Sequence, residues 1–404
     1  MKRLVWLVAL VGCDGGQAIS QPTGSGETIG GGSAGPFFES LGTNGRTCAS
    51  CHDQTAGWSL APPALQTLFD ATSGLDPVFG ANDGTTSPTA AIGSIDERRV
   101  AFQLLLDRGL IRVGRPFPTT TEIALQSVDD PYAFASAAEL SLFRRPLPAT
   151  NLRFLATVMW DGREPDLQHQ AIDATTGHAE AADLDPATAA DIVAFESGLT
   201  TAERFDDIAG DLSADGARGG AVALASQAFD PTAAFDRDAF TLYTAWANAT
   251  QDRQRAIANG EQIFNTHTFQ IRGVAGIADQ RGTCSTCHDT PNVGSHSTPL
   301  FLDLGVGDPD DDDVRGLPVY HLTNPGTGQT ASTTDPGYAI TTGHWADLGK
   351  FKVPGLRGLA MRAPYFHNGR ARDLGDVVQF YDRKFDLHLS NGETADLVAF
   401  LGAL

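Results

Sequence analysis

The chain has 404 residues, of which 41% are hydrophobic and 19% charged, a composition that excludes both a disordered chain and a multi-span membrane protein. The 28 Lys and Arg residues against 49 Asp and Glu give a formal net charge of −21, which disfavours a nucleic-acid partner because phosphates require cations. The length suits two or three domains, and the 44 Gly and 22 Pro residues predict plentiful loops.

The first residues have the pattern of an export signal. Positive charge at residues 1–3 precedes an apolar run at 4–12, which is too short to cross a bilayer as a helix. The run ends at Cys13 in a sequence that resembles a bacterial lipobox, so residues 1–13 are predicted to be a signal peptide whose Cys13 receives a lipid. A plain signal peptide cleaved further on is the alternative. Residues 14–36 are predicted to be a flexible tether, which makes the protein exported, periplasm-facing and membrane-bound only through this anchor.

Apolar residues recur at helical spacing along most of the remaining chain, whereas strand-like alternation is scarce. The predicted helices cover residues 95–107, 152–159, 182–198, 236–264, 373–384 and 392–403. The segments expected to be loops are 72–94, 112–131 and 290–349, which are rich in Gly, Pro, Asp and Thr. The predicted fold class is therefore mainly α with long irregular loops.

A short repeat divides the chain. Residues 48–52 read Cys-Ala-Ser-Cys-His, and residues 284–288 read Cys-Ser-Thr-Cys-His. Two domains with one motif each are the economical interpretation, with an N-terminal domain at 37–255 and a C-terminal domain at 256–404.

These motifs predict covalently bound haem. Two thiols at this spacing can bond the two vinyl groups of one haem, and the adjacent His can ligate its iron. A zinc site or a redox dithiol is the alternative, but neither explains why His follows directly both times. The residues expected to hold two c-type haems are Cys48, Cys51, His52, Cys284, Cys287 and His288.

Three further motifs lie between and after the two Cys motifs. Residues 160–163 read Trp-Asp-Gly-Arg, residues 351–357 read Phe-Lys-Val-Pro-Gly-Leu-Arg, and residues 363–369 read Ala-Pro-Tyr-Phe-His-Asn-Gly. In this order they resemble the motifs of the di-haem cytochrome c peroxidases and their MauG-like relatives, which mature a protein-derived cofactor. The resemblance covers most of residues 37–404. It implies two cytochrome c-like domains, an N-terminal peroxidatic haem and a C-terminal electron-transfer haem.

The resemblance also implies roles for residues around the first haem. Trp160 would lie between the haems and couple them electronically, unless it is an ordinary buried Trp. Gln170 and Glu180 keep the family's offsets from this Trp; the Gln would hold peroxide, and the Glu would be the distal acid–base group, unless it is a solvated surface residue.

This region departs from the family in two ways. Ala174 stands where a Pro is usual, and His178 stands two residues before Glu180. His178 is therefore a second candidate for the acid–base group, or an iron ligand that closes the site. The peroxidases with a mobile inhibitory ligand carry a His between the first haem motif and the Trp motif. No His occurs between His52 and His169 here, so the resemblance implies that the first haem is open without reductive activation.

For the second haem, the family's distal ligand lies 14 residues after the His of Pro-Tyr-Phe-His, which is His367 here. That position is Tyr381, where the peroxidases have Met and the MauG-like members have Tyr. A phenolate stabilises ferric iron and lowers its potential, whereas Met raises it. A Tyr that merely packs in a helix is the other interpretation, and Met361 is the alternative ligand.

A calcium ion lies between the domains in this family, where an Asn binds it. Arg145 occupies the Asn position here, so the resemblance leaves this ion in doubt. The acidic loop with Asp308 and Asp310–Asp313 offers another candidate site for calcium, unless it is simply solvated.

The expected function is reduction of hydrogen peroxide to water. A small redox protein, a cytochrome c or a cupredoxin, would supply the electrons, which would pass from the C-terminal haem to the N-terminal haem. A MauG-like oxidase acting on a partner protein and a non-catalytic di-haem electron carrier are the alternatives. Tyr381 favours the oxidase, and His178 as an iron ligand would favour the carrier.

Overall fold

The computed structural model describes residues 24–118, 122–230, 238–309 and 312–404. Helix accounts for 33% and strand for 16% of the structure. The α-helices are α1 Pro62–Thr72, α2 Ile95–Ala101, α3 Gln103–Arg108, α4 Leu167–His178, α5 Pro186–Gly198, α6 Ala221–Ala225, α7 Asp252–Thr266, α8 Ala339–Thr342, α9 Leu374–Phe385 and α10 Asn391–Leu401. The strands are β1 Gly24–Ile29, β2 Ile111–Arg115, β3 Ala124–Asp129, β4 Leu140–Arg144, β5 Thr200–Asp206, β6 Gly210–Asp211, β7 Phe269–Ile271, β8 Gln280–Gly282, β9 Phe301–Leu302, β10 Val319–Thr323, β11 Thr330–Thr333 and β12 Phe351–Lys352.

Most of the predicted helices are present, and their ends follow local capping. The helix predicted at 95–107 is divided into α2 and α3, and Ser94 caps α2 in a capping box with Glu97. The helix predicted at 182–198 begins only at Pro186, because Asp185 caps it. The helices predicted at 373–384 and 392–403 are confirmed as α9 and α10.

One helix prediction is wrong, and another is confirmed only in its second half. Within 152–159 the structure has only a 3-10 turn, Leu152–Phe154, and Met159 has a left-handed φ of 61°. Residues 155–160 line a cavity instead, so tertiary contacts outweigh the apolar spacing. Within 236–264, α7 begins at Asp252, and the described residues before it form only a short 3-10 turn, Thr244–Trp246.

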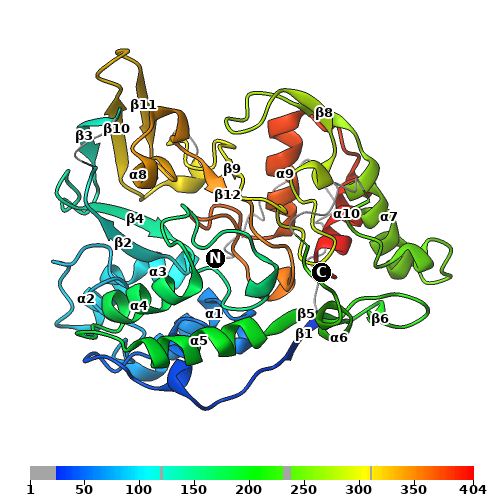
Figure 1. Ribbon diagram of the computed structural model, residues 1–404, viewed down its shortest axis with the longest axis horizontal. Coiled ribbons are helices and arrows are strands. Elements are labelled where there is room, and N and C mark those ends of the chain that lie inside the picture. Colours follow the sequence, from blue (N-terminus) through cyan, green and yellow to red (C-terminus); the bar gives the residue numbers. More distant parts are fainter. Residues whose placement is uncertain (1–23, 119–121, 231–237, 310–311) are drawn as a thin grey trace, which may run out of the picture.

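The mainly α prediction also misses strands inside two segments expected to be loops. Strand β3 lies within 112–131, and strands β10 and β11 lie within 290–349. They form one antiparallel sheet in the order β11-β10-β3, visible at the upper left of Figure 1. The partners β3 and β10 are far apart in the sequence, so neither segment shows the pairing by itself.

This sheet joins the two halves of the chain. Tyr320 of β10 is fully buried, and its hydroxyl donates to the carbonyl oxygen of Ser141 and accepts from the Ser141 amide, both at 2.8 Å. Leu140 and Leu142 of β4 pack in the same hydrophobic cluster as Tyr320. Contacts between the first and second halves are therefore part of the core.

The tether predicted at 14–36 is wrong for residues 24–29. These residues form β1, which pairs antiparallel with β5 at the lower right of the fold in Figure 1. Main-chain hydrogen bonds thus order a segment whose polar composition predicts flexibility. The signal peptide at 1–13 and its Cys13 lie outside the described residues, and among the described helices none is long and apolar enough to cross a membrane.

Two hydrophobic clusters flank the Cys motifs. Phe37, Trp58 and residues of α4 and α5 pack beside Cys48, whereas α7, α9 and α10 pack beside Cys284. The second cluster also includes Phe240, Tyr243 and other residues before position 255. The domain boundary near residue 255 stays a prediction, and this core continues across it.

Candidate functional site

The two Cys motifs fold in the same way. Each begins with a 3-10 turn, Cys48–Ser50 or Cys284–Thr286, that a preceding threonine caps. The amide of the motif's His donates to the carbonyl oxygen of the first Cys, at 3.0 Å for His52 and 3.1 Å for His288. Each turn therefore brings its own two thiols and imidazole together in the wall of one cavity, and the two turns line different cavities.

The histidines of both motifs are held in one tautomer. His52 Nδ1 lies 3.0 Å from the carbonyl oxygen of Trp58, and His288 Nδ1 lies 2.5 Å from that of Gly294. Because a carbonyl oxygen only accepts, Nδ1 carries the hydrogen and Nε2 keeps its lone pair. Burial lowers the pKa of both rings, to about 4 for His288. A neutral imidazole oriented through its other nitrogen is the form that ligates metals.

The first motif lines a cavity of about 610 Å³. One face of α4 and the segment 144–160 contribute most of the other walls, together with α5 residues such as Ile192 and Glu196. Glu196 is buried, its Oε2 has no hydrogen-bond partner among the described residues, and burial raises its pKa to about 8. No motif in the sequence marks Glu196, which stands in a helix of mainly apolar residues.

The second motif lines a smaller cavity of about 220 Å³, mainly apolar, which Tyr381 of α9 also lines. Burial raises the pKa of the Tyr381 hydroxyl. The alternative ligand Met361 is not among the lining residues. Its side chain packs closely against Gly26 of β1, where a Cβ atom, if the residue had one, would lie 2.1 Å from Met361 Cε. The structure therefore brings Tyr381, and not Met361, to the cavity of the second motif.

Helix α4 presents one face to the first cavity. Gln170, Ala174 and His178 are spaced four residues apart, and all three line the cavity. Ala174 allows the helix to continue to His178, whereas a Pro inside it would break it. The helix then ends, and Glu180, with a left-handed φ of 57°, is exposed and does not line the cavity. The structure thus brings Gln170 and His178 to the cavity and leaves Glu180 outside.

Asp83 and Arg46 lie behind His178. His178 Nδ1 is 2.5 Å from Asp83 Oδ2, and Asp83 Oδ1 accepts from the Arg46 guanidinium. All three residues line the first cavity, and Arg46 and Asp83 are buried. Sequence analysis missed this pair because Asp83 lies in a loop 95 positions from His178, with no motif to mark it.

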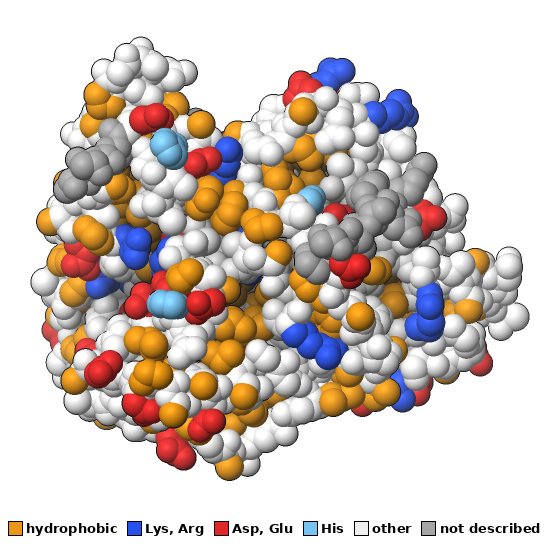
Figure 2. Space-filling model, viewed as in Figure 1, with side chains coloured by type: hydrophobic (Ala, Val, Ile, Leu, Met, Phe, Trp, Pro, Cys, Tyr) orange, Lys and Arg blue, Asp and Glu red, His pale blue; other side chains and the backbone are white. Residues whose placement is uncertain are grey.

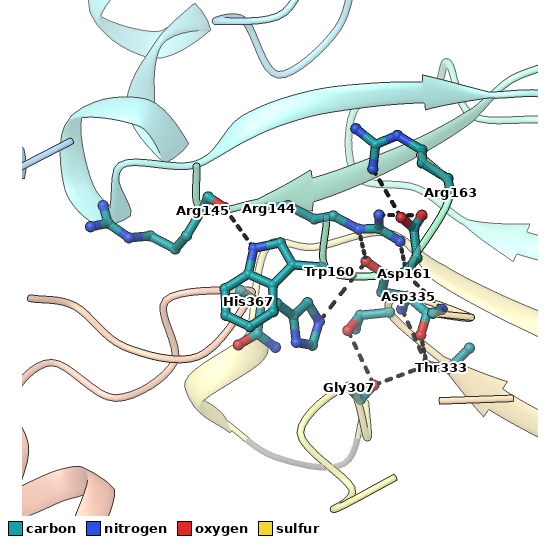
Figure 3. Close-up of polar contacts among 12 residues, drawn as sticks. Arg144, Arg145, Trp160, Asp161, Arg163, Gly307, Thr333, Asp335 and His367 are labelled. Atoms are coloured by element: carbon teal, nitrogen blue, oxygen red, sulfur yellow. Dashed lines mark hydrogen bonds and ion pairs between the residues drawn. The ribbon is translucent and has the colours of Figure 1, made fainter. Parts of the chain in front are cut away.

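Trp160 lies in the wall that the two cavities share. It lines both, as do Arg145, Lys352 and Arg362. Its Nε1–H donates to the carbonyl oxygen of Arg145 at 2.8 Å, and its own carbonyl oxygen accepts from the Lys352 amide at 3.0 Å. Figure 3 shows the indole beside the imidazole of His367, a residue that lines the second cavity.

A buried ion network supports this wall (Figure 3). Arg144 bonds Asp335 through two nitrogens, at 2.6 and 2.8 Å, and Asp161 at 2.6 Å. Asp161 also accepts from Arg163 at 3.0 Å. Burial alone would raise the pKa of Asp161, but the two guanidinium groups outweigh it and hold the pKa well below its usual range. The Asp and Arg of Trp-Asp-Gly-Arg therefore anchor the residues next to Trp160.

The thiols do not have the properties of a redox dithiol. Burial raises the pKa of Cys48 and Cys284 to about 12 and that of Cys51 and Cys287 to about 11. A reactive redox cysteine has a lowered pKa. The four thiols are also divided between two cavities, so they share no common zinc site.

The cavities fit a haem with carboxylate side chains. In the first, Arg357 is buried, and its NH2 group has no hydrogen-bond partner among the described residues. In the second, His367 is buried, and its Nε2 has no hydrogen bond there; the nearest carboxylate oxygen, on Asp335, is 3.9 Å away. A buried polar atom without a partner is costly, and an anionic group bound in the cavity would supply the partner for Arg357.

The calcium predictions have no geometric support among the described residues. No group of three or more His, Cys, Asp or Glu side chains gathers there as a metal site. Arg145, at the family's Asn position, is buried and donates to the carbonyl oxygens of Leu60, Arg108 and Arg362. Asp310 and Asp311 lie outside the described residues.

Two cavities, each lined by a Cys-Xaa-Xaa-Cys-His motif with an oriented neutral His, are typical of c-type cytochromes. A family model described as di-haem cytochrome c peroxidase matches residues 37–249, more than half of the chain. The chain belongs to this family, whose members carry haem iron.

Individual relatives are more distant. Cytochrome-c peroxidase IdrP1 of Denitromonas iodatirespirans is 31% identical over 44% of this chain and 50% of its own length. Methylamine utilization protein MauG of Methylophilus methylotrophus is 26% identical over 81% of this chain and 87% of its own length. The crystal structure of a MauG-like protein associated with microbial copper homeostasis aligns over 91% of this chain and 85% of that one, with a TM-score of 0.44 and 17% identity. The chain spans about half the length of the peroxidase relative.

Proposed function

We propose that this protein is an exported di-haem c-type peroxidase that reduces hydrogen peroxide to water. One observation carries the proposal: two cavities with the same Cys motif share Trp160 in their wall, but among the described residues a helix presents an amide and an imidazole, Gln170 and His178, only to the first, whereas α9 presents Tyr381 to the second. That asymmetry suits one open site for peroxide and one site for electron transfer.

The haems would be held through thioether bonds to the four motif cysteines and through Nε2 of His52 and His288. Bound there, they would supply the redox chemistry H₂O₂ + 2 e⁻ + 2 H⁺ → 2 H₂O, with the electrons delivered by a cytochrome c or a cupredoxin at the C-terminal site. The net charge of −21 favours a donor with a basic face, and Asp and Glu side chains outnumber Lys and Arg on the face in Figure 2.

The protein's own groups would bind peroxide and move its proton. Gln170 can hold peroxide by hydrogen bonds, and His178 would take the proton from the near oxygen and return it to the far oxygen, so that water leaves. The proposal prefers His178 to Glu180 because α4 ends before Glu180, which is exposed and does not line the cavity. Tyr381 would be the second ligand at the C-terminal site.

A MauG-like oxidase is the second candidate. Tyr381 lines the second cavity, at the position where the peroxidases that this chain resembles have Met. An anionic phenolate there would lower the redox potential of that site. Such a protein would oxidise residues of a partner protein in place of consuming electrons from a donor. The lipid anchor at Cys13 and the periplasm-facing location remain parts of the proposal for either function.

Spectra and turnover of the purified ferric protein test the proposal. A peroxidase should show one high-spin and one low-spin haem by EPR, and should oxidise a reduced small cytochrome or cupredoxin when hydrogen peroxide is added. Two low-spin haems and no turnover would establish an electron carrier. A high-spin haem that reacts with peroxide but oxidises no donor would favour the oxidase.

A further inference from the structure

The Asp83 carboxylate contacts the ring of His178 directly. The 2.5 Å distance joins His178 Nδ1 to Asp83 Oδ2. His178 is the last residue of α4, and its side chain is 36% exposed, whereas that of Asp83 is only 7% exposed. The carboxylate thus lies on the protein side of the ring, behind a histidine that lines the first cavity.

Asp83 is itself firmly held. Its other oxygen accepts from Arg46, whose guanidinium also donates to the carbonyl oxygens of Pro77 at 2.8 Å and Val78 at 2.7 Å. Burial would raise the pKa of Asp83, but the hydrogen bonds and charges of His178 and Arg46 outweigh it, so the pKa is lowered. Asp83 is therefore a fixed anion.

The main chain at His178 is held as well. Its carbonyl oxygen accepts from Asn44 Nδ2 at 2.8 Å and from Asn82 Nδ2 at 3.2 Å. With the backbone and Nδ1 both fixed, the ring has little freedom to rotate. A carboxylate only accepts, so in the neutral ring Nδ1 carries the hydrogen and Nε2, on the other edge of the ring, has the lone pair.

We propose that Asp83 is a positioning residue for His178: it fixes the tautomer whose Nε2 is the base and stabilises the imidazolium that forms when Nε2 takes the peroxide proton. The proposal rests on the proposed function of the first cavity. The proton returns to the far oxygen of peroxide, so the Asp83–His178 pair ends each cycle unchanged. Among the described residues, the other charged or titratable groups that interact with this pair include Arg46, which donates to Asp83, and two groups on the cavity wall, His52 and Cys51.

Cyanide binding to the ferric holoprotein tests the proposal without turnover, because hydrogen cyanide also loses a proton as it binds. The association rate would be followed by stopped flow over a range of pH, beside the rate with hydrogen peroxide. We expect His178→Ala to slow both by about 10²–10⁴-fold and Asp83→Asn to slow both by about tenfold or more. The double variant should be no slower than His178→Ala alone, because Asp83 acts through His178.

Asp70→Asn is the matched control, because Asp70 also pairs with an arginine, Arg99, but at the surface; it should leave both rates unchanged. Asp83→Glu keeps the charge opposite Arg46 and should restore part of the rate, while the pH of half-maximal rate differs from that of the wild type. If Asp83→Asn yields no folded holoprotein, an Asp83→Glu variant with the wild-type rate and pH profile overturns the proposal.

Two results separate failure of this inference from failure of the proposed function. An Asp83→Asn variant with wild-type rates, or a double variant slowed by the product of the two single effects, overturns the role of Asp83 alone. If the His178→Ala variant reacts at wild-type rates, His178 is not the base, and the role proposed for α4 in the peroxide reaction fails.

Discussion

The indole of Trp160 lies edge-on to the imidazole of His367, with 6.2 Å between the ring centroids and 65° between the ring planes. His367 in turn stacks on Phe351, with centroids 3.8 Å apart. Trp160 lines both cavities and His367 lines the second, so this pair forms a continuous aromatic contact from the shared wall toward the second cavity.

Replacing Trp160 should therefore slow electron exchange between the two sites. Trp160→Phe removes the Nε1–H bond to the carbonyl oxygen of Arg145, which should cost about 0.5–1.5 kcal/mol of stability, and it narrows the aromatic surface between the cavities. Stopped-flow spectra after peroxide addition would report how fast the second site is oxidised. Trp345→Phe, outside both cavities, is the control; equal rates in the two variants would show that Trp160 is only structural.

The haem assignment predicts a simple stoichiometry. The double variant Cys284→Ala, Cys287→Ala should retain one covalent haem, because Cys48 and Cys51 lie in the other cavity. A pyridine-haemochrome assay on the purified chain measures the number directly. The reciprocal variant Cys48→Ala, Cys51→Ala is the control and should also retain one; two covalent haems in either variant would contradict the assignment.

Tyr381→Phe should change the C-terminal site and leave the N-terminal site intact. The substitution removes the phenolate donor, so we expect the low-spin ferric EPR signal to change and the potential of that haem to rise if another ligand binds. Tyr365→Phe is the matched control: Tyr365 lines the same cavity, but its hydroxyl donates to the Leu359 carbonyl oxygen at 2.7 Å. An EPR spectrum unchanged by Tyr381→Phe would exclude Tyr381 as a ligand.

The two candidates for the distal base are separated by activity. His178→Ala should slow the reaction with hydrogen peroxide by about 10²–10⁴-fold, whereas Glu180→Gln should leave it near the wild-type rate, because Glu180 is exposed. The opposite ranking would return the role to Glu180. A His178→Ala variant that becomes high-spin and more active would instead identify His178 as a closing iron ligand.

Glu196 should make stability depend on pH. Burial raises its pKa from 4.5 to about 8, so between these values the folded chain retains a proton that the unfolded chain has released. Stability therefore falls as the pH rises from about 4.5 to about 8 and levels off above. Glu196→Gln removes this dependence, and its stability relative to wild type should increase by about 1 kcal/mol or more across the window.

Urea unfolding of wild type and variant at several pH values measures this difference. Glu180→Gln is the control, because that side chain is exposed. Parallel pH profiles for wild type and Glu196→Gln would show that Glu196 is ionised in the folded protein.

The cofactor motifs, α9 and α10 could be predicted because each depends on local spacing. The pairing of β3 with β10 could not, because its partners lie almost 200 positions apart and carry weak local patterns. The distal site was predicted in part: the offset of Gln170 holds, but the position of Glu180 depends on where α4 ends. Ala174 in place of Pro allows α4 to continue to His178, but the end of the helix is evident only from the structure. Asp83 has no signal in the sequence, since only the fold brings it to His178.

The pairing of β3 with β10 has a consequence for biogenesis. A chain synthesised from its N-terminus presents β3 long before residues 319–323 arrive, so one edge of β3 meets no partner during this interval. An N-terminal fragment that ends at the predicted boundary would keep this edge open and would lack Tyr320 in the cluster around Leu140 and Leu142. Such a fragment should aggregate when it is expressed alone, and co-expression of residues 256–404 should rescue it.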